Sequence, residues 1–191
     1  MLLKALVFLL STIGGLFALA LLLRFMLQLV RAPARNPLSD FLAALTNFAV
    51  RPARRLIPGS WGIDWATLLL AWITEIVLIW LVLKLTGFEP GAAVGTMLVG
   101  LGFLAAVELA RIAIYIVMVA VIMQAILSWV NPYSALAPLL ASFTRPVLRP
   151  LQRRVPPIAN VDLSPLIVLL LCQLALMVPI AWAEAAARQL L

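Results

Sequence analysis

The sequence contains no histidine and a single cysteine, Cys172, within 191 residues. Without histidine there is no Ser-His-Asp triad, no histidine general base and no histidine metal ligand. One thiol cannot form an internal disulfide or a cysteine metal cluster. Charge is scarce too: 11% of the residues are charged, 65% are hydrophobic and the mean hydropathy is +1.16. A soluble globule, with about 25% charged residues, is therefore excluded, and neither an enzyme nor a cofactor is expected.

Long apolar runs dominate the chain and predict an all-α membrane protein, because about 20 apolar residues suffice to span a bilayer. The four expected transmembrane helices cover residues 2–30, 64–85, 94–130 and 163–190. The first run has features of a signal peptide, but its length favours an uncleaved anchor. Pro179 lacks a backbone N–H and predicts a local kink in the last span. The third run is too long for one simple span, so residues 91–107 stay open as transmembrane, interfacial or re-entrant.

A duplicated pattern divides the chain into a first repeat, residues 1–90, and a second repeat, residues 91–191. A shift of 98 positions aligns residues 38–75 with residues 136–173 without a gap. Each copy consists of an apolar span, Asn-Pro, an amphipathic segment, an Arg-Pro cluster, Asp and a second apolar span. The residues that carry this pattern are Asn36, Pro37, Arg51, Pro52, Arg55 and Asp64 in the first copy and Asn131, Pro132, Arg149, Pro150, Arg153 and Asp162 in the second.

Apolar residues recur at helical spacing after each Asn-Pro and predict short amphipathic helices over residues 37–50 and 135–144. Asn36 is placed to cap the first of them, with Pro37 at its first position. Such a helix suits the membrane interface, but packing onto the end of the protein's own helical bundle would explain the same pattern. The sequence leaves both alternatives open.

Asp64 and Asp162 each stand where a basic segment enters an apolar span. A carboxylate at that place predicts an N-cap, which bonds the free N–H groups of the helix and faces the positive end of its dipole. A contact with Arg55 or Arg153 in the same segment is compatible with this role.

Positive charge is concentrated in residues 31–63 and 131–161, which together hold nine of the 14 basic residues and one acidic residue. The positive-inside rule predicts that both segments are cytoplasmic and that both termini lie on the other side. The two repeats then have parallel orientation, unlike the inverted repeats of many transporters. Ten of the 13 prolines also lie there and predict stiff Arg-Pro loops. All nine basic residues are arginines, which favours bidentate contact with phosphate or carboxylate.

Several polar side chains inside the expected spans are candidates for a role within the membrane, namely Arg24, Glu75, Glu108, Arg111, Gln124 and Gln173. An ionisable group at the centre of a bilayer costs at least about 2.5 kcal/mol and usually faces protein or water. The repeat places Arg24 on Gln124 and Glu75 on Gln173. One hypothesis is an ionic contact between the spans of the first repeat and an amide contact in the second, with Arg111 as a rival partner for Glu75. A solute or proton path is the alternative to such a structural role.

The ordered set of Asn-Pro, Thr, Arg-Pro-x-x-Arg-x-x-Pro and Asp resembles the YggT family, also called YlmG. The resemblance covers residues 24–75 and 124–173, and bacterial members often carry two tandem copies. The second copy keeps the usual Leu127-Ser128-Trp129, whereas the first departs from it with Leu27-Gln28-Leu29. The resemblance implies a multi-pass protein of the bacterial plasma (inner) membrane. Family members have been linked to cell division, envelope organisation, osmotic tolerance and, in plastids, assembly of membrane complexes.

Two functions of different classes are consistent with these features. The first is a non-enzymatic scaffold or assembly factor in envelope organisation, cell division or membrane-complex biogenesis, whose basic loops contact anionic lipid headgroups or a membrane or cytoplasmic protein. The second is a small channel or transporter linked to osmotic or ion balance. Nucleic acid is not an expected partner, because the aromatic residues near the arginines suit an interfacial helix better than base stacking. The sequence does not identify the partner, a solute or a homo-oligomer.

Overall fold

The computed structural model describes residues 1–33, 36–59, 62–88, 94–131, 134, 136–154 and 162–191. Its elements are α1 (Leu2–Leu29), α2 (Pro37–Leu56), α3 (Trp65–Leu85), α4 (Val94–Val130), α5 (Ala137–Gln152), α6 (Ser164–Ala175), the π-helical turn η1 (Leu176–Ile180) and α7 (Ala181–Arg188). Four helical stretches are long and apolar enough to cross a membrane, namely α1, α3, α4 and the continuous α6–η1–α7. The predicted all-α fold with four spanning helices is confirmed.

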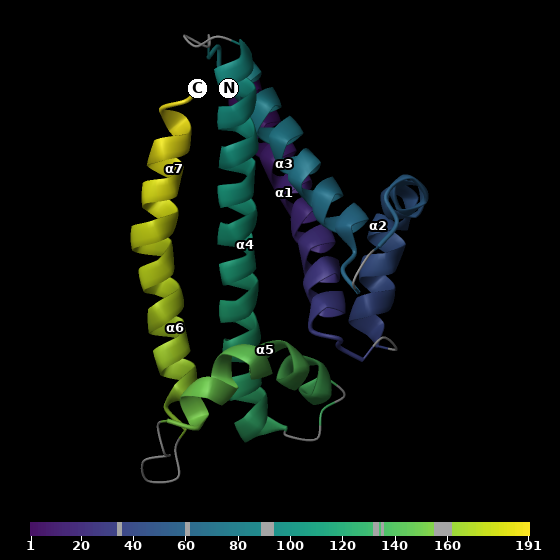
Figure 1. Ribbon diagram of the computed structural model, residues 1–191, viewed down its shortest axis with the longest axis vertical. Coiled ribbons are helices and arrows are strands. Elements are labelled where there is room, and N and C mark those ends of the chain that lie inside the picture. Colours follow the sequence, from purple (N-terminus) through teal and green to yellow (C-terminus); the bar gives the residue numbers. More distant parts are fainter. Residues whose placement is uncertain (34–35, 60–61, 89–93, 132–133, 135, 155–161) are drawn as a thin grey trace.

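The spanning helices form two hairpins that share one orientation (Figure 1). α1 runs away from the N-terminus and α3 returns, and α4 and α6 repeat this path, so that both termini lie at the same end of the molecule. Both helices of the first hairpin contact α4, which also packs against α6 and α7. The short helices α2 and α5 lie within the connections at the ends of the hairpins that are opposite the termini. The two repeats therefore present their short helices in equivalent places.

The third apolar run forms one continuous helix, α4, of 37 residues. This limits the three alternatives left open for residues 91–107. At 1.5 Å per residue it is about 55 Å long, whereas the hydrocarbon core is about 30 Å thick, so α4 tilts or protrudes. The Nε1 atom of Trp72 on α3 donates to the carbonyl oxygen of Gly102 at 2.8 Å. Residues 94–107 thus continue the helix and pack on α3, which rules out a re-entrant segment for them, and residues 91–93 lie outside the described residues.

The proline in the last span disturbs its helix locally, as predicted. Pro179 lies inside the π-helical turn η1, which separates α6 from α7. Because proline has no backbone N–H, it cannot complete the regular α-helical ladder, and a wider turn is one way to absorb the missing bond.

The Arg-Pro clusters are helical, which corrects the prediction of loops. The helices α2 and α5 extend six and eight residues beyond their predicted ends and include Pro52 and Pro150. Proline removes a helical hydrogen bond and disfavours helical conformation in the residue before it. Packing overrides this preference, because Val50 and Leu148, two residues before these prolines, are 0% and 3% exposed. The stiffness expected of the loops is therefore that of helices anchored by buried side chains.

Candidate functional site

Each short helix is fixed to its own hairpin through one face, on which three residues recur at a spacing of four. We call these sets the anchoring stripes. Residues spaced by four lie on the same side of a helix. The threonine and the aliphatic residue of each stripe are buried, with exposed fractions of 0% to 3%. The anchoring stripes are Thr46, Val50 and Arg54 in α2 and, 98 positions later, Thr144, Leu148 and Gln152 in α5.

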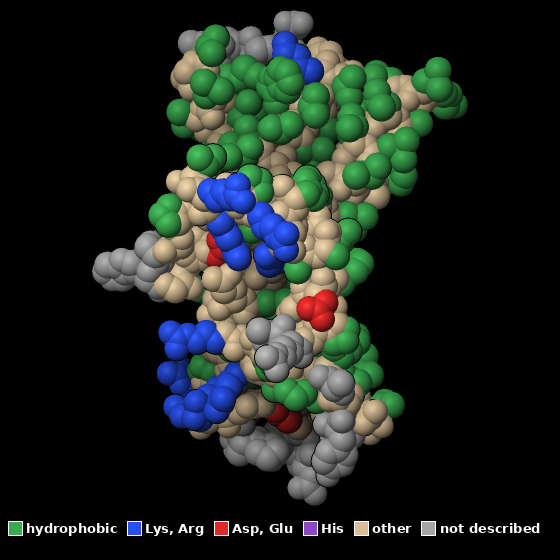
Figure 2. Space-filling model, turned by 90° about the vertical axis from the view of Figure 1, so that its right-hand side faces the viewer, with side chains coloured by type: hydrophobic (Ala, Val, Ile, Leu, Met, Phe, Trp, Pro, Cys, Tyr) green, Lys and Arg blue, Asp and Glu red, His purple; other side chains and the backbone are tan. Residues whose placement is uncertain are grey.

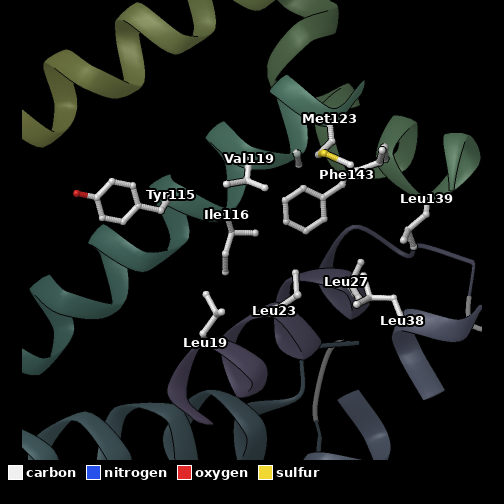
Figure 3. Close-up of a pocket in the computed structure, with 12 residues that line it drawn as sticks. Leu19, Leu23, Leu27, Leu38, Tyr115, Ile116, Val119, Met123, Leu139 and Phe143 are labelled. Carbon is white, nitrogen blue, oxygen red and sulfur yellow. The ribbon is translucent and has the colours of Figure 1, made fainter. Parts of the chain in front are cut away.

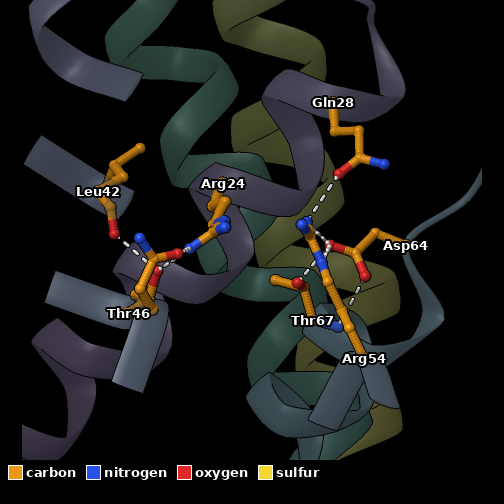
Figure 4. A network of polar contacts seen from close by, with 8 residues as sticks. Arg24, Gln28, Leu42, Thr46, Arg54, Asp64 and Thr67 are labelled. Carbon is orange, nitrogen blue, oxygen red and sulfur yellow. Dashed lines mark hydrogen bonds and ion pairs between the residues drawn. The ribbon is translucent and has the colours of Figure 1, made fainter. Parts of the chain in front are cut away.

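The threonine of each anchoring stripe contacts a polar side chain of the spanning helix that precedes it. The Nη1 atom of Arg24 on α1 donates to Oγ1 of Thr46 at 2.6 Å and to Oδ1 of Asn47 at 2.9 Å (Figure 4). In the second repeat, the hydroxyl of Thr144 donates to the side-chain oxygen of Gln124 on α4. Arg24 and Gln124 are equivalent in the repeat, so both contacts fasten a short helix to the spanning helix before it.

The third residue of each anchoring stripe contacts the aspartate that opens the next spanning helix. Both Nε and Nη2 of Arg54 donate to Oδ2 of Asp64, at 3.1 and 2.5 Å (Figure 4). In the second repeat, Nε2 of Gln152 donates to Oδ2 of Asp162 at 2.8 Å. Each short helix is thus held near its middle to the spanning helix before it and near its C-terminal end to the aspartate that precedes the next spanning helix.

The two aspartates also bond to the starts of the helices that follow them. Asp64 is the N-cap of α3, as predicted, and accepts hydrogen bonds from the backbone N–H and hydroxyl of Thr67 at 3.3 and 2.5 Å. Asp162 was expected to be the N-cap of α6, but Leu163 occupies that position; Asp162 lies one residue earlier and accepts from the N–H of Ser164 at 2.8 Å. Burial opposes ionisation of Asp64, but hydrogen bonds from Arg54 and Thr67 hold its pKa below the usual value. Burial likewise opposes ionisation of Asp162, and hydrogen bonds from its neighbours lower its pKa.

Acidification should weaken the first repeat through Asp64. Its pKa lies below the ordinary value of 3.8 in the folded protein, so its stabilising effect is complete above that pH and is lost as the pH falls through the folded pKa. We expect the free energy of unfolding in detergent micelles, measured from neutral pH down to about pH 3, to fall at the acid end. The control Asp64→Asn should be less stable at neutral pH and show a flatter profile, and equal slopes in both proteins would contradict this assignment.

The motif residues Arg51, Pro52, Arg55, Arg149, Pro150 and Arg153 are all exposed. The contact considered for Arg55 with an aspartate is made by Arg54 instead, and in the second repeat by Gln152 instead of Arg153. Helical geometry explains the difference: successive residues are turned by about 100°, so the neighbour of a stripe residue points away from the hairpin. The motif arginines are consequently free of the contacts that position the helices.

The Asn-Pro pairs behave differently in the two repeats. The side chain of Asn36 accepts from the N–H of Ser39 at 2.9 Å and caps α2, and Pro37 is the first residue of that helix, as predicted. Asn131 is exposed and follows the end of α4, separated from α5 by the extra residues of the second copy. Pro132 lies outside the described residues.

Inside the spanning region, a chain of ion pairs links α4 to α7. Arg111 pairs with Glu108 on its own helix at 2.9 Å and with Glu184 on α7. Glu184 also pairs with Arg188 at 2.8 Å. The side chains of Arg111, Glu108 and Glu184 are 21% to 26% exposed, so the cluster is largely withdrawn from the surface. These pairs fasten the last helix of the chain to the long central helix.

Neither of the hypothesised contacts between spans, Arg24 with Glu75 or Gln124 with Gln173, occurs among these described residues. Arg24 and Gln124 bind the short helices instead. Glu75 is 5% exposed on α3, while its counterpart Gln173 is exposed on α6. The rival partner Arg111 is engaged by two other glutamates. Arg24 and Glu75 do not meet because they lie at different depths in the bundle. Arg24 is near the end of α1, whereas Glu75 is about 15 Å along α3.

Residues that make these contacts but were not predicted from the sequence include Arg54, Gln152 and Glu184. Arg54 and Gln152 differ in type, which hid their common role. They nevertheless align without a gap, both can donate to a carboxylate, and each precedes its aspartate by ten residues. Glu184 has no such signal, because its partner Arg111 is 73 residues away in the chain.

On the face shown in Figure 2, lysine and arginine side chains gather in two main groups below the largest hydrophobic area, and a further cationic group lies at the top of the view. Arginine presents a planar fork of donors that suits phosphate and carboxylate oxygens. Because α2 and α5 are bonded to the spanning helix before them and to the aspartate after them, the arginines on these helices are held in defined places. No cluster of three or more His, Cys, Asp or Glu residues that could bind a metal occurs in the described ranges. The exposed guanidinium groups are chemically able to bind an anion.

Comparison with known proteins agrees with this repeated architecture. The profile of the CCB3/YggT family matches residues 3–85 and 103–183. An uncharacterized protein of Pseudomonas aeruginosa is 38% identical over 172 residues, which cover 89% of this chain and 85% of that protein. The uncharacterized protein YggT of Escherichia coli K12 is 34% identical over 169 residues, 88% and 85% of the two chains. No solved structure matches the chain. The chain therefore belongs to the CCB3/YggT family.

Proposed function

We propose that this membrane protein is a non-enzymatic scaffold or assembly factor in envelope organisation, cell division or the biogenesis of membrane complexes. The observation that carries the proposal is the equivalent fastening of α2 and α5. Each helix is bound to the spanning helix before it and to the aspartate after it, and each leaves its motif arginines exposed. Two fixed copies of one cationic surface suit the recognition of anionic lipid headgroups or of an acidic membrane or cytoplasmic protein.

The proposal places α2 and α5 on the cytoplasmic side of the inner membrane. Nine of the 14 basic residues lie in or next to these helices, and positive charge is retained on the cytoplasmic side. Because the two hairpins have the same orientation, a single placement puts both arginine-bearing helices on that side and both termini on the other. Association of several copies would multiply the cationic surface and is part of the same proposal.

The alternative function, a small channel or transporter, has less support. The charges of Glu108, Arg111, Glu184 and Arg188 pair with one another and connect two helices. Paired charges of this kind are expected of intramembrane structural links as well as of ion paths. Ion flux into liposomes that contain the purified protein, lost on substitution of Glu75, would support the channel over the scaffold.

Photo-crosslinking in native membranes tests the scaffold. A photo-reactive amino acid at position 51 or 149 should capture one specific acidic protein or anionic lipid from both positions. Capture should fall sharply in Arg55→Gln/Arg153→Gln, which removes two motif arginines. The matched control Lys4→Gln/Lys84→Gln removes the same charge from exposed positions outside the motif and should leave capture unchanged. An equal loss in both variants would show dependence on total charge alone and would contradict the proposal.

A further inference from the structure

We propose that the seam between the two repeats binds one anionic phospholipid, with an acyl chain in an apolar pocket and the phosphate on a row of arginines in α5. This inference rests on the proposed function, since it names one ligand of the cationic surface and the place where that ligand lies. It is carried by an apolar and a cationic pocket whose lining residues are neighbours along the end of α1 and along α5.

The first pocket lies where the two repeats face each other and has a volume of about 270 Å³. Figure 3 shows Leu23 and Leu27 of α1 opposite Val119 of α4, with the ring of Phe143 from α5 between them. Its lining is built from aliphatic and aromatic side chains, apart from the hydroxyl end of Tyr115. Val119 is 59% exposed, so the pocket opens to the outside of the bundle. In a bilayer, an apolar opening of this kind contacts hydrocarbon and suits an acyl chain.

The second pocket has a volume of about 390 Å³ and is lined by residues at the end of α1 and along α5. Val30 lines it, one turn beyond Leu27 of the apolar pocket. Ser142 lines it as well, next to Phe143 of the apolar pocket. Its cationic residues, spaced by four along one face of α5, are Arg145, Arg149 and Arg153.

These three arginines are available to a ligand. None of the ion pairs in the described part of the chain involves them. Three guanidinium groups along one helix face can surround the oxygens of a phosphate, and at a membrane surface they favour anionic over zwitterionic headgroups. A free phosphate would leave the apolar pocket unfilled, and an acidic peptide would place polar backbone against it. A phospholipid satisfies both pockets at once.

The row of three arginines occurs in the second repeat alone. The positions equivalent to Arg145, Arg149 and Arg153 are Asn47, Arg51 and Arg55 in α2. Asn47 is neutral, and its side-chain oxygen is already bonded to Arg24. The first repeat therefore lacks the third cation of the row.

Native mass spectrometry of the purified full-length protein with phosphatidylglycerol or phosphatidylcholine tests the site. We expect one phosphatidylglycerol to be retained in preference to phosphatidylcholine. Arg145→Gln/Arg149→Gln/Arg153→Gln should weaken its binding about a hundredfold, because each arginine near an anionic surface contributes roughly fivefold. The control Lys4→Gln/Lys84→Gln/Arg188→Gln removes the same charge from exposed positions outside the cationic surface and should leave binding within about threefold of the original protein.

The acyl-chain pocket needs its own variant. Val119→Trp should fill the pocket and weaken phosphatidylglycerol binding, whereas Val99→Trp, at an exposed position of α4 outside the pocket, should not. If Val119→Trp fails to fold, Met123→Trp fills the same pocket from the next turn. Glycerol phosphate, which has the headgroup chemistry without chains, should not compete.

Several results would overturn this inference. They are equal retention of both lipids, equal weakening by the control triple variant, competition by glycerol phosphate, or unchanged binding in a folded pocket-filled variant. In each case the cationic surface would lack a lipid site at the seam. Crosslinking of an acidic protein from positions 51 and 149 would still support the scaffold, so the two proposals fail separately.

Discussion

Replacing Arg111 with methionine should lower the free energy of unfolding by about 3 kcal/mol, because removal of one partner from a buried ion pair leaves the other charge uncompensated. Arg111 pairs with Glu108 and with Glu184, so its loss leaves two carboxylates without this cation. We expect a cost at the low end of the range for a broken buried ion pair, because these side chains are still 21% to 26% exposed. Reversible unfolding in mixed detergent micelles, followed by helical circular dichroism, measures the change.

A double-mutant cycle separates this ion pair from general packing. Arg111→Met/Glu184→Gln should recover part of the loss, because the carboxylate on α7 is neutralised together with its partner. The exposed partner of Glu184, Arg188, is the control: its side chain is 62% exposed, and Arg188→Gln should cost less than about 1 kcal/mol. If Arg111→Met is no more costly than Arg188→Gln, the ion pairs do not fasten α7 to α4.

Asp64→Ala should destabilise the protein by about 3 kcal/mol, since it removes an N-cap and the hydrogen bonds to a charged partner. The equivalent Asp162→Ala should cost about 1 kcal/mol, because it removes hydrogen bonds to a neutral amide and to the start of α6. Asp64 is 3% exposed and bonds Arg54 through two nitrogens, whereas the contact of Asp162 with Gln152 is exposed. Unfolding of the two variants under identical detergent conditions gives the comparison.

Arg54→Gln is the control for the different costs of the two aspartate substitutions. It gives the first repeat the glutamine that the second repeat has at the equivalent position, Gln152. The variant loses the ion pair and keeps an amide that can donate to Asp64. The further cost of Asp64→Ala in this background should therefore be smaller than in the original protein. Equal costs for the two aspartates in the original protein would show that the pair of Arg54 with Asp64 adds nothing beyond capping.

Much of the fold could be predicted from the sequence because hydropathy and helix length are local properties. Apolar runs of sufficient length predict the spans and the order of the elements. Gapless matching of residues 98 positions apart predicts the repeat. The ends of α2 and α5 could not be predicted in this way. Pro52 and Pro150 indicate a break, and only burial of Val50 and Leu148 beside them shows that helix continues.

The candidate site was predictable where a contact is local in the chain. Asn36 and Asp64 were expected as caps, and both are. The partner of Arg24 was not predictable, because alignment identified polar positions in the spans but did not give their depth. Arg24 reaches sideways to Thr46 on the short helix, while Glu75 is buried farther along α3. Which partner a polar side chain in a span contacts depends on how the helices tilt and pack. The periodic pattern of the sequence carries no information about either.

Cysteine labelling across the membrane tests the shared orientation of the two hairpins most directly. In a Cys172→Ser background, single variants Arg51→Cys and Arg149→Cys place a thiol on each arginine-bearing helix, and Leu2→Cys and Leu190→Cys place one near each terminus. We predict that an impermeant maleimide labels positions 51 and 149 only after the cytoplasmic face is opened, and labels positions 2 and 190 in cells whose plasma membrane is intact. Labelling of positions 51 and 149 from opposite sides would contradict the parallel repeat and the single cationic surface built on it.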